Sequence, residues 1–299
     1  KRVVLIGWDA ADWKVIDQLI EKGQMPALEG MMKKGVRGNL STLEPVLSPM
    51  LWTSIATGKY ADKHGIHGFT EPDHEAGIVR PISSISRKSR AFWNILTNQG
   101  KKTNVFSWWP SNPAEPIDGI MVSNLYQRAN KSMKKGWPMN AGTVHPSELA
   151  DHFKSIRIHP DELTEEHILP FLPMANKIDQ EKDKRLGSLS KIIADAATVH
   201  SASTWALENT DWDLTAIYHD AIDHACHAFM KFRAPQLPNV PEDLFEIYKD
   251  AVDGMYRFHD MMLERTLKLV GPDTNVILIS DHGFQSDHMR PLSLPKEPA

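Results

Sequence analysis

The sequence of 299 residues has little cysteine, no long apolar run and no strong excess of charge. Its single cysteine, Cys226, excludes an intrachain disulfide framework and a metal site built from thiolates alone. This cysteine usage fits a reducing cytoplasm, although disulfide-free proteins are also exported. No apolar run approaches the ~20 residues of a membrane-spanning helix, so we expect no transmembrane segment. With a net charge of -4, no specific nucleic-acid binding is expected.

Short apolar runs alternate with helical patterns along most of the chain. Strands that alternate with helices predict a mostly parallel sheet with helices on both faces, a three-layer α/β/α fold. Expected strands are Val3–Ile6, a short strand after Gly35–Gly38, Thr103–Ser107, Ile120–Ser123, Leu214–Tyr218 and Asn275–Ser280. Expected helices are two pieces within Trp13–Lys34 divided by Pro26, one from Pro49 to Thr57, Ala91–Asn98, Arg185–Asn209, Ala221–Lys231 and Pro241–Leu269.

Residues 128–184 differ from this pattern because prolines, histidines and charged residues surround short helices. Apolar residues such as Phe153, Ile168 and Phe171 still anchor the segment, so we interpret it as an inserted, mainly helical cap. We expect residues 1–299 to form one catalytic domain around this cap. The chain enters a strand directly after Lys1–Arg2 and closes on a proline-rich stretch, so we expect the domain to be truncated at both ends.

Polar residues follow several of the expected strands. Asp9 ends the first strand, Asp223 and His227 follow the strand at Leu214–Tyr218, and Asp281–His282 follows the last one. The carboxyl ends of parallel strands meet at one edge of a sheet, so these side chains should converge there. Carboxylates and imidazoles together are suited to hold a divalent metal ion, and a hydroxyl beside that ion can act as a nucleophile.

Each of these signals also has a simpler explanation. Asp9 could cap the following helix, although Asp12 competes for that position. Ser48 precedes Pro49 and is expected to be the N-cap, where unpaired amides favour a phosphate or an alkoxide; it could also be a capping serine only. Asp223 and His227 are four residues apart on one helix face, which suits two ligands of one metal ion, but the stretch could equally be a polar helix entrance.

The Asp281–His282 pair leaves two chemistries open. A buried pair at a sheet terminus needs a partner, and a metal ion is a suitable one. Gly283 allows the turn that would orient both side chains. A catalytic Asp–His pair without metal, as in a serine esterase, is the alternative. The absence of a G-x-S-x-G motif weakens that alternative.

In order, these motifs resemble the alkaline phosphatase superfamily, and within it the type I phosphodiesterase and nucleotide pyrophosphatase branch. The matching segments are LIGWDA, LSPMLWTSIATGKYADKHGIHGF, YHDAIDHACH and ISDHGF. They extend from Asp9 to Gly283, so the resemblance spans nearly the whole chain. It implies an alkaline phosphatase-like fold and a metal-dependent hydrolase of small phosphate esters or nucleotides.

The resemblance also implies a role for each matching residue. Asp9, Asp281 and His282 would bind one Zn²⁺ ion, with Mn²⁺ or another divalent metal as alternatives, and the Ser48 oxygen would lie beside it as nucleophile. Asp223 and His227 would bind a second ion. A phosphoseryl intermediate would follow. His64 matches a family motif but is interpreted as structural.

One ligand and the substrate class stay open at this point. The family has a further histidine on the second zinc, which we expect beyond Ala299, with His288 as a weak candidate. Ser48 lacks the following arginine of a sulfatase motif, and Asp9–Ala10 departs from the Asp–Gly of phosphoglycerate mutases. A phosphomonoesterase and a non-catalytic metal- or ligand-binding relative are the alternatives to a phosphodiesterase.

Overall fold

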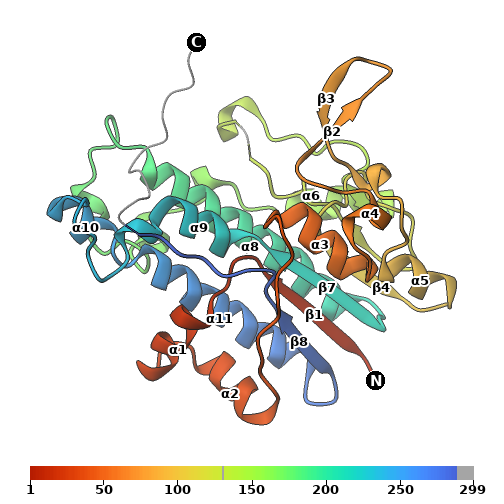
Figure 1. Ribbon diagram of the computed structural model, residues 1–299, viewed down its shortest axis with the longest axis horizontal. Helices are drawn as coiled ribbons and strands as arrows, with labels where there is room; N and C mark the ends of the chain where they lie inside the picture. Colours follow the sequence, from red (N-terminus) through yellow and green to blue (C-terminus); the bar gives the residue numbers. More distant parts are fainter. Residues whose placement is uncertain (130, 288–299) are drawn as a thin grey trace.

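A six-stranded sheet forms the centre of the computed structural model, which describes residues 1–129 and 131–287 (Figure 1). The strand order is β6-β5-β4-β7-β1-β8. All neighbours pair in parallel except β6, which runs antiparallel to β5 at the edge. The strands are β1 Val3–Trp8, β4 Thr103–Phe106, β5 Met121–Val122, β6 Val144–His145, β7 Leu214–His219 and β8 Asn275–Ile279.

Helices cover both faces of this sheet. The α-helices are α1 Trp13–Glu21, α2 Pro26–Lys34, α3 Ser48–Thr57, α4 Ala61–His64, α5 Phe92–Asn98, α6 Ala150–Ser155, α7 Glu165–Ile168, α8 Arg185–Asn209, α9 Ala221–Phe229, α10 Glu242–Tyr248 and α11 Ala251–Val270. Short 3₁₀ helices lie at Ser84–Ser86, Met133–Lys135, Ser147–Leu149, Pro160–Glu162, Ala175–Lys177 and Met230–Phe232.

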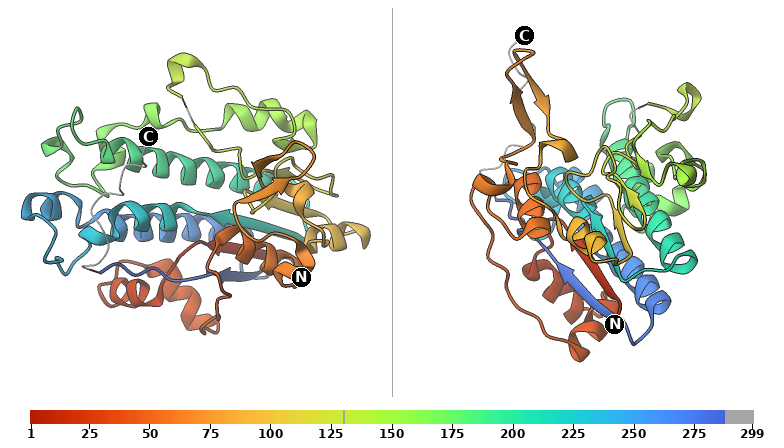
Figure 2. Two further views of the ribbon diagram at one scale, coloured as in Figure 1. Left: turned by 45° about the horizontal axis from the view of Figure 1, so that its top comes forward. Right: turned by 90° about the vertical axis from the view of Figure 1, so that its right-hand side faces the viewer.

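The alternation of side chains along β1 divides the interior into two cores. Val4 and Ile6 face the larger core, which is formed with α1, α2, α8, α9 and α11. Leu5 faces the smaller one, where Trp52 of α3 packs with Trp93 and Trp108. Successive residues of a strand point to opposite faces, so one apolar strand supplies both cores. The predicted three-layer α/β/α fold is confirmed, and Figure 2 shows the layers from two further directions.

The predicted elements agree with the structure at most positions. Helix α8 has the predicted bounds, and the helical pattern at 13–34 divides into α1 and α2, with Pro26 beginning the second. Two expectations were wrong. No strand follows Gly38, because residues 36–47 run exposed and irregular along the surface. The helix expected over 241–269 is two helices, α10 and α11.

A small hairpin outside the main sheet had no sequence prediction. Its strands are β2 Thr70–Asp73 and β3 Ile78–Pro81, and Figure 1 shows it projecting from the side of the molecule that carries α4. Arg80 pairs with Glu71 and Asp73 across the two strands. Its two strands contain only Ile78 and Val79 as large apolar side chains, both of them exposed, so no apolar periodicity indicated it.

The segment 128–184 is anchored as its apolar residues suggested. Phe153, Ile168 and Phe171 are buried in the larger core, and β6 of this segment adds the edge strand of the main sheet. Its division from the rest of the chain as a cap stays a prediction. Among the described residues, no helix is both long enough and apolar enough to cross a membrane.

Candidate active site

Asp9 lies at the carboxyl end of β1 and is almost fully buried. Its Oδ2 accepts hydrogen bonds from Trp52 Nε1 at 3.1 Å and from the Tyr218 hydroxyl at 2.5 Å. Burial, together with the nearby carboxylates, raises the pKa of Tyr218 well above its usual value, so the phenol stays protonated and donates. Both bonds fix one oxygen of Asp9 and leave Oδ1 directed to the other site residues.

Asp9 is not a helix cap. The N-cap of α1 is Asp12, whose Oδ1 accepts a hydrogen bond from the Lys14 amide at 2.8 Å. The simpler explanation for Asp9 is therefore wrong, and its carboxylate is available for other chemistry.

Asp281 and His282 follow β8 beside Asp9. His282 Nε2 lies 3.2 Å from Asp9 Oδ1 and 3.7 Å from Asp281 Oδ2. The other ring nitrogen, Nδ1, donates to the Gly283 carbonyl at 2.8 Å. A histidine that donates through one nitrogen to a carbonyl holds its other nitrogen ready for a metal ion.

The carboxylates of Asp9 and Asp281 both lie close to the His282 imidazole, and this proximity shifts the pKa values of Asp281 and His282. Burial, reinforced by the charge of Asp9, raises the pKa of Asp281. Burial alone would lower the pKa of His282, but the bond to Asp9 and the charge of Asp281 outweigh it and raise that pKa. Asp281 Oδ2 is buried and has no hydrogen-bond partner among the described residues. Such a donor set fits a divalent cation, which would neutralise both carboxylates and give Asp281 Oδ2 a partner.

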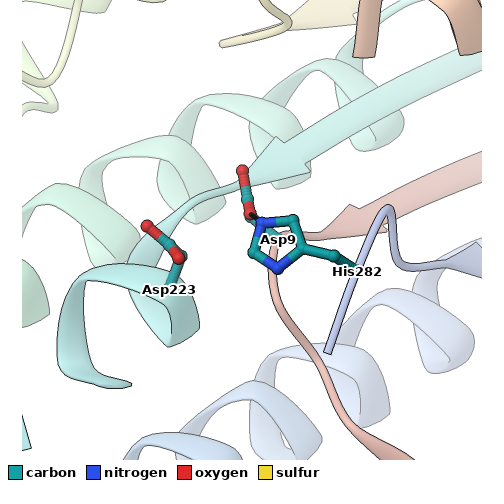
Figure 3. Close-up of side chains that lie close together, drawn as sticks. All are labelled: Asp9, Asp223 and His282. Atoms are coloured by element: carbon teal, nitrogen blue, oxygen red, sulfur yellow. Dashed lines mark ion pairs between the residues drawn. The ribbon is translucent and has the colours of Figure 1, made fainter. Parts of the chain in front are cut away.

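Asp223 completes the group from the first turn of α9. Asp9, Asp223 and His282 each offer a ligand atom, and these three atoms all lie within 4.8 Å of one another (Figure 3). His227 lies further out: its Nε2 is 3.4 Å from Asp223 Oδ1 and its side chain is 59% exposed. The strand-end positions predicted from the sequence therefore do converge.

Ser48 is the hydroxyl beside this group. Its Oγ donates to Asp9 Oδ1 at 3.4 Å. The N-cap of α3 is Leu47, and Ser48 is the first helical residue, so the expected capping role was wrong. No side chain among the described residues caps α3 through a hydrogen bond, so the Ser48 hydroxyl is free of capping.

Trp52 and Tyr218 were not predicted as site residues. Trp52 lies four residues after Ser48, so both project from one face of α3, and that spacing was a usable signal. Tyr218 is paired in register with Gly7, two residues before Asp9. Only the order of strands in the sheet brings it there, and the sequence does not contain that order.

A serine–histidine contact further along α3 cannot activate a nucleophile. Ser54 Oγ and His64 Nε2 are 2.9 Å apart. The Ile66 amide donates to His64 Nδ1, so the proton of the neutral ring is on Nε2, which donates to Ser54. Ser54 in turn donates to the Met50 carbonyl. Burial lowers the pKa of His64 to about 4, which keeps the ring neutral. His64 is thus a structural link between α3 and α4.

None of the site residues described above is the further histidine that the resemblance implies for a second zinc ion. His288, the weak candidate for that ligand, lies outside the described residues.

A sequence model of the type I phosphodiesterase / nucleotide pyrophosphatase family matches residues 3–290 of the chain. A search of curated proteins gives no match. Solved structures with a similar fold include phosphonoacetate hydrolase from Sinorhizobium meliloti, at 15% identity and a TM-score of 0.51, over 94% of this chain and 56% of that one. Murine ectonucleotide pyrophosphatase/phosphodiesterase 5 is similar at 14% identity and a TM-score of 0.51, over 97% of this chain and 59% of that one.

A putative sulfatase from Bacteroides thetaiotaomicron is also similar, at 10% identity and a TM-score of 0.52, over 97% of this chain and 61% of that one. At these identities the structures support the fold alone. The chain spans about three fifths of the length of these proteins. The family itself follows from the sequence match over nearly all residues: the chain belongs to the type I phosphodiesterase / nucleotide pyrophosphatase family.

Proposed function

We propose that this chain is a divalent-metal-dependent hydrolase of phosphodiesters or nucleotide pyrophosphates with Ser48 as nucleophile. The observation that carries the proposal is the Ser48 hydroxyl, 3.4 Å from Asp9 Oδ1, beside a group of donors that could hold a metal ion. A binding protein would have no use for a hydroxyl there. The family match and the order of the motifs support the same chemistry.

In this proposal Asp9, Asp281 and His282 hold one Zn²⁺ ion, and Asp223 with His227 holds part of a second site. Bound zinc supplies Lewis-acid chemistry, because it favours the ionised form of a neighbouring hydroxyl and stabilises negative charge on phosphoryl oxygens. Asp9 is held by Trp52 and Tyr218, so its free oxygen keeps a fixed position toward Ser48.

Ser48 would attack the phosphorus of the substrate. The bond between phosphorus and the leaving oxygen breaks, the leaving group takes the hydroxyl proton, and the phosphoryl group with its remaining ester stays on Ser48. Water then attacks the phosphorus, and the Ser48 oxygen leaves and regains a proton. Ser48 begins the ten-residue helix α3, whose positive dipole end favours the charge on both the phosphoryl group and the serine oxygen.

The direct test is hydrolysis of bis-p-nitrophenyl phosphate by the zinc-loaded protein, with p-nitrophenyl phosphate alongside. We expect diester cleavage that a chelator abolishes and zinc restores. Ser48→Ala should lower kcat at least about 1000-fold, because it removes the nucleophile. Its zinc content, measured by mass spectrometry, should stay the same.

Thr57→Ala is the matched control, since Thr57 ends the same helix and its hydroxyl bonds only to backbone groups: it donates to the Thr53 carbonyl and accepts from the Lys59 amide. It should hydrolyse the diester at the wild-type rate. Cleavage of the monoester alone would instead indicate a phosphomonoesterase. Diester cleavage that survives Ser48→Ala would remove Ser48 from the mechanism.

A further inference from the structure

A cavity of about 300 Å³ beside residues 125–157 is lined by three cationic side chains. These are Arg128, Lys131 and Arg157, and none of the described residues that line the cavity is acidic. Cationic side chains gathered in a concave site whose lining carries no carboxylate favour an anion. We refer to it as the cationic cavity.

Arg157 is a partly buried cation of this cavity. Its guanidinium stacks on Trp137, 3.8 Å from the ring centroid, and Nη2 donates to the Trp137 carbonyl at 2.5 Å. Its Nε is buried without a hydrogen-bond partner, and no described carboxylate lies within 4.0 Å of the guanidinium. A partly buried cation with no counter-charge is costly, and a bound anion would offset that cost.

Trp137 keeps Arg157 in place. The indole Nε1 donates to the Arg128 carbonyl at 3.0 Å, and the edge of the ring meets His159 at 5.2 Å between centroids. Because the stacked pair is fixed on two sides, its donors are presented without a large loss of side-chain freedom on binding.

Arg128 connects this cavity to the candidate active site. It pairs with Asp195 at 3.1 Å and with Asp220, which immediately precedes α9, the helix of Asp223 and His227. Arg128 also lines a second cavity of about 450 Å³, together with Lys191 and His227. Arg128 therefore lines both the cationic cavity and a cavity that contains His227 of the candidate active site. Since two carboxylates already neutralise Arg128, Arg157 and Lys131 would supply the binding charge.

We propose that the cationic cavity binds an anionic group, a phosphate or a carboxylate. That group belongs either to the far end of the substrate or to a separate small molecule. In the first case the proposal rests on the proposed function and narrows the substrate to a phosphodiester with a second anionic group. In the second case the binding is independent of turnover.

The kinetic test uses two p-nitrophenyl diesters of thymidine 5′-phosphate that differ only in a 3′-phosphate. In the zinc-loaded protein, Lys131→Gln and Arg157→Gln should raise KM for the phosphorylated substrate about tenfold and leave the other substrate unchanged. The matched control is Lys134→Gln, since Lys134 is exposed in the same segment but does not line the cavity. Lys134→Gln should leave KM unchanged for both substrates.

The binding test is calorimetric titration of inorganic phosphate into the same four zinc-loaded proteins. A weakening of about tenfold in Lys131→Gln and Arg157→Gln, without any change in the kinetics, would assign the cavity to a separate anion. Equal phosphate binding and equal kinetics in all four proteins would overturn the proposal. Absence of diester hydrolysis in the wild type would count against the proposed function only, because the titration needs no turnover. Lys131 is exposed, so its variant decides the result if Arg157→Gln fails to fold.

Discussion

In the proposed metal site, Tyr218 would position Asp9 and would not itself be a ligand. Its hydroxyl donates to Asp9 Oδ2 at 2.5 Å from the neighbouring strand, in a fully buried position. Hydrogen bonds of this kind orient a metal-binding carboxylate, and their loss commonly lowers metal affinity by about 10- to 100-fold. We expect a decrease of this size in the zinc affinity of Tyr218→Phe, measured by competition with a chromogenic chelator.

Tyr126→Phe is the control for this change. Tyr126 is also buried, and its hydroxyl donates to the Phe153 carbonyl at 2.8 Å, in the other core. Both variants lose one buried hydrogen bond, so both should lose about 1 kcal/mol of unfolding free energy. Only Tyr218→Phe should lose zinc affinity. An equal effect of the two variants on zinc would contradict the positioning role.

At the scale of elements, β1 and α3 depend on one close contact. Gly7 of β1 lies under the Trp52 ring, so that a Cβ atom at this position would come within 2.5 Å of Trp52 Cζ3. Trp52 is fully buried and also donates to Asp9, so the ring has no room to move away. Glycine is required here because the ring of α3 packs directly on the strand backbone.

Gly7→Ala should therefore lower the unfolding free energy by about 1–3 kcal/mol, because it overpacks the smaller core. It should also weaken zinc binding by displacing Trp52 from Asp9. Urea unfolding measures the first effect and the chelator competition measures the second. Gly30→Ala is the control: Gly30 lies within α2, a Cβ there meets open space, and the change should stabilise by up to about 1 kcal/mol. A stable Gly7→Ala protein with normal zinc affinity would disprove the close contact.

The elements themselves were largely predictable from the sequence. The helix Arg185–Asn209 and the strands at Val3, Leu214 and Asn275 follow from long periodic patterns or from compact apolar runs. The break between α10 and α11 was missed because no proline or glycine lies between Tyr248 and Ala251. The hairpin β2–β3 was missed because its strands bury too little apolar surface to leave a pattern.

The candidate site was predictable wherever a strand end determined it. Asp9, Asp281 and His282 follow strands, and parallel strands bring such residues together. The hydrogen bonds of Asp9 to Trp52 and Tyr218 depend instead on the sheet order and on how α3 packs, which are tertiary features. The cationic cavity could not be predicted from the sequence for the same reason, because only the fold of the segment between Arg128 and Arg157 places both of them around one cavity.

At the scale of the whole molecule, three buried histidines and the half-buried His200 make stability depend on pH. Burial is the largest cause in each case: it lowers the pKa of His64, His200 and His259 to about 4, and that of His219 well below its usual value. Above pH 6.5 these rings are neutral in both the folded and the unfolded chain. Below pH 6.5 the unfolded chain takes up protons that the folded chain does not, so stability falls as the pH falls.

His259 allows this effect to be isolated. Its ring is fully buried, its Nδ1 donates to the Met255 carbonyl at 2.9 Å, and its Nε2 has no hydrogen-bond partner among the described residues. A proton on Nε2 would therefore be a buried charge with no hydrogen-bond acceptor, and the charge of Asp220 offsets its cost only in part. Asp195 acts in the opposite direction: burial, partly offset by Arg128, raises its pKa to about 7. A single pH curve of the wild type would mix these contributions.

The informative measurement is the difference between the wild type and His259→Gln, which cannot titrate and keeps an N–H donor. From urea unfolding at several pH values, we expect the wild type to lose more stability than the variant between pH 6.5 and about pH 4. The difference should approach about 1.4 kcal/mol per pH unit, the value for one proton bound only by the unfolded chain. Above pH 6.5 the two curves should run parallel. Curves that stay parallel down to pH 4 would mean that His259 is protonated as easily in the folded protein as in the unfolded one.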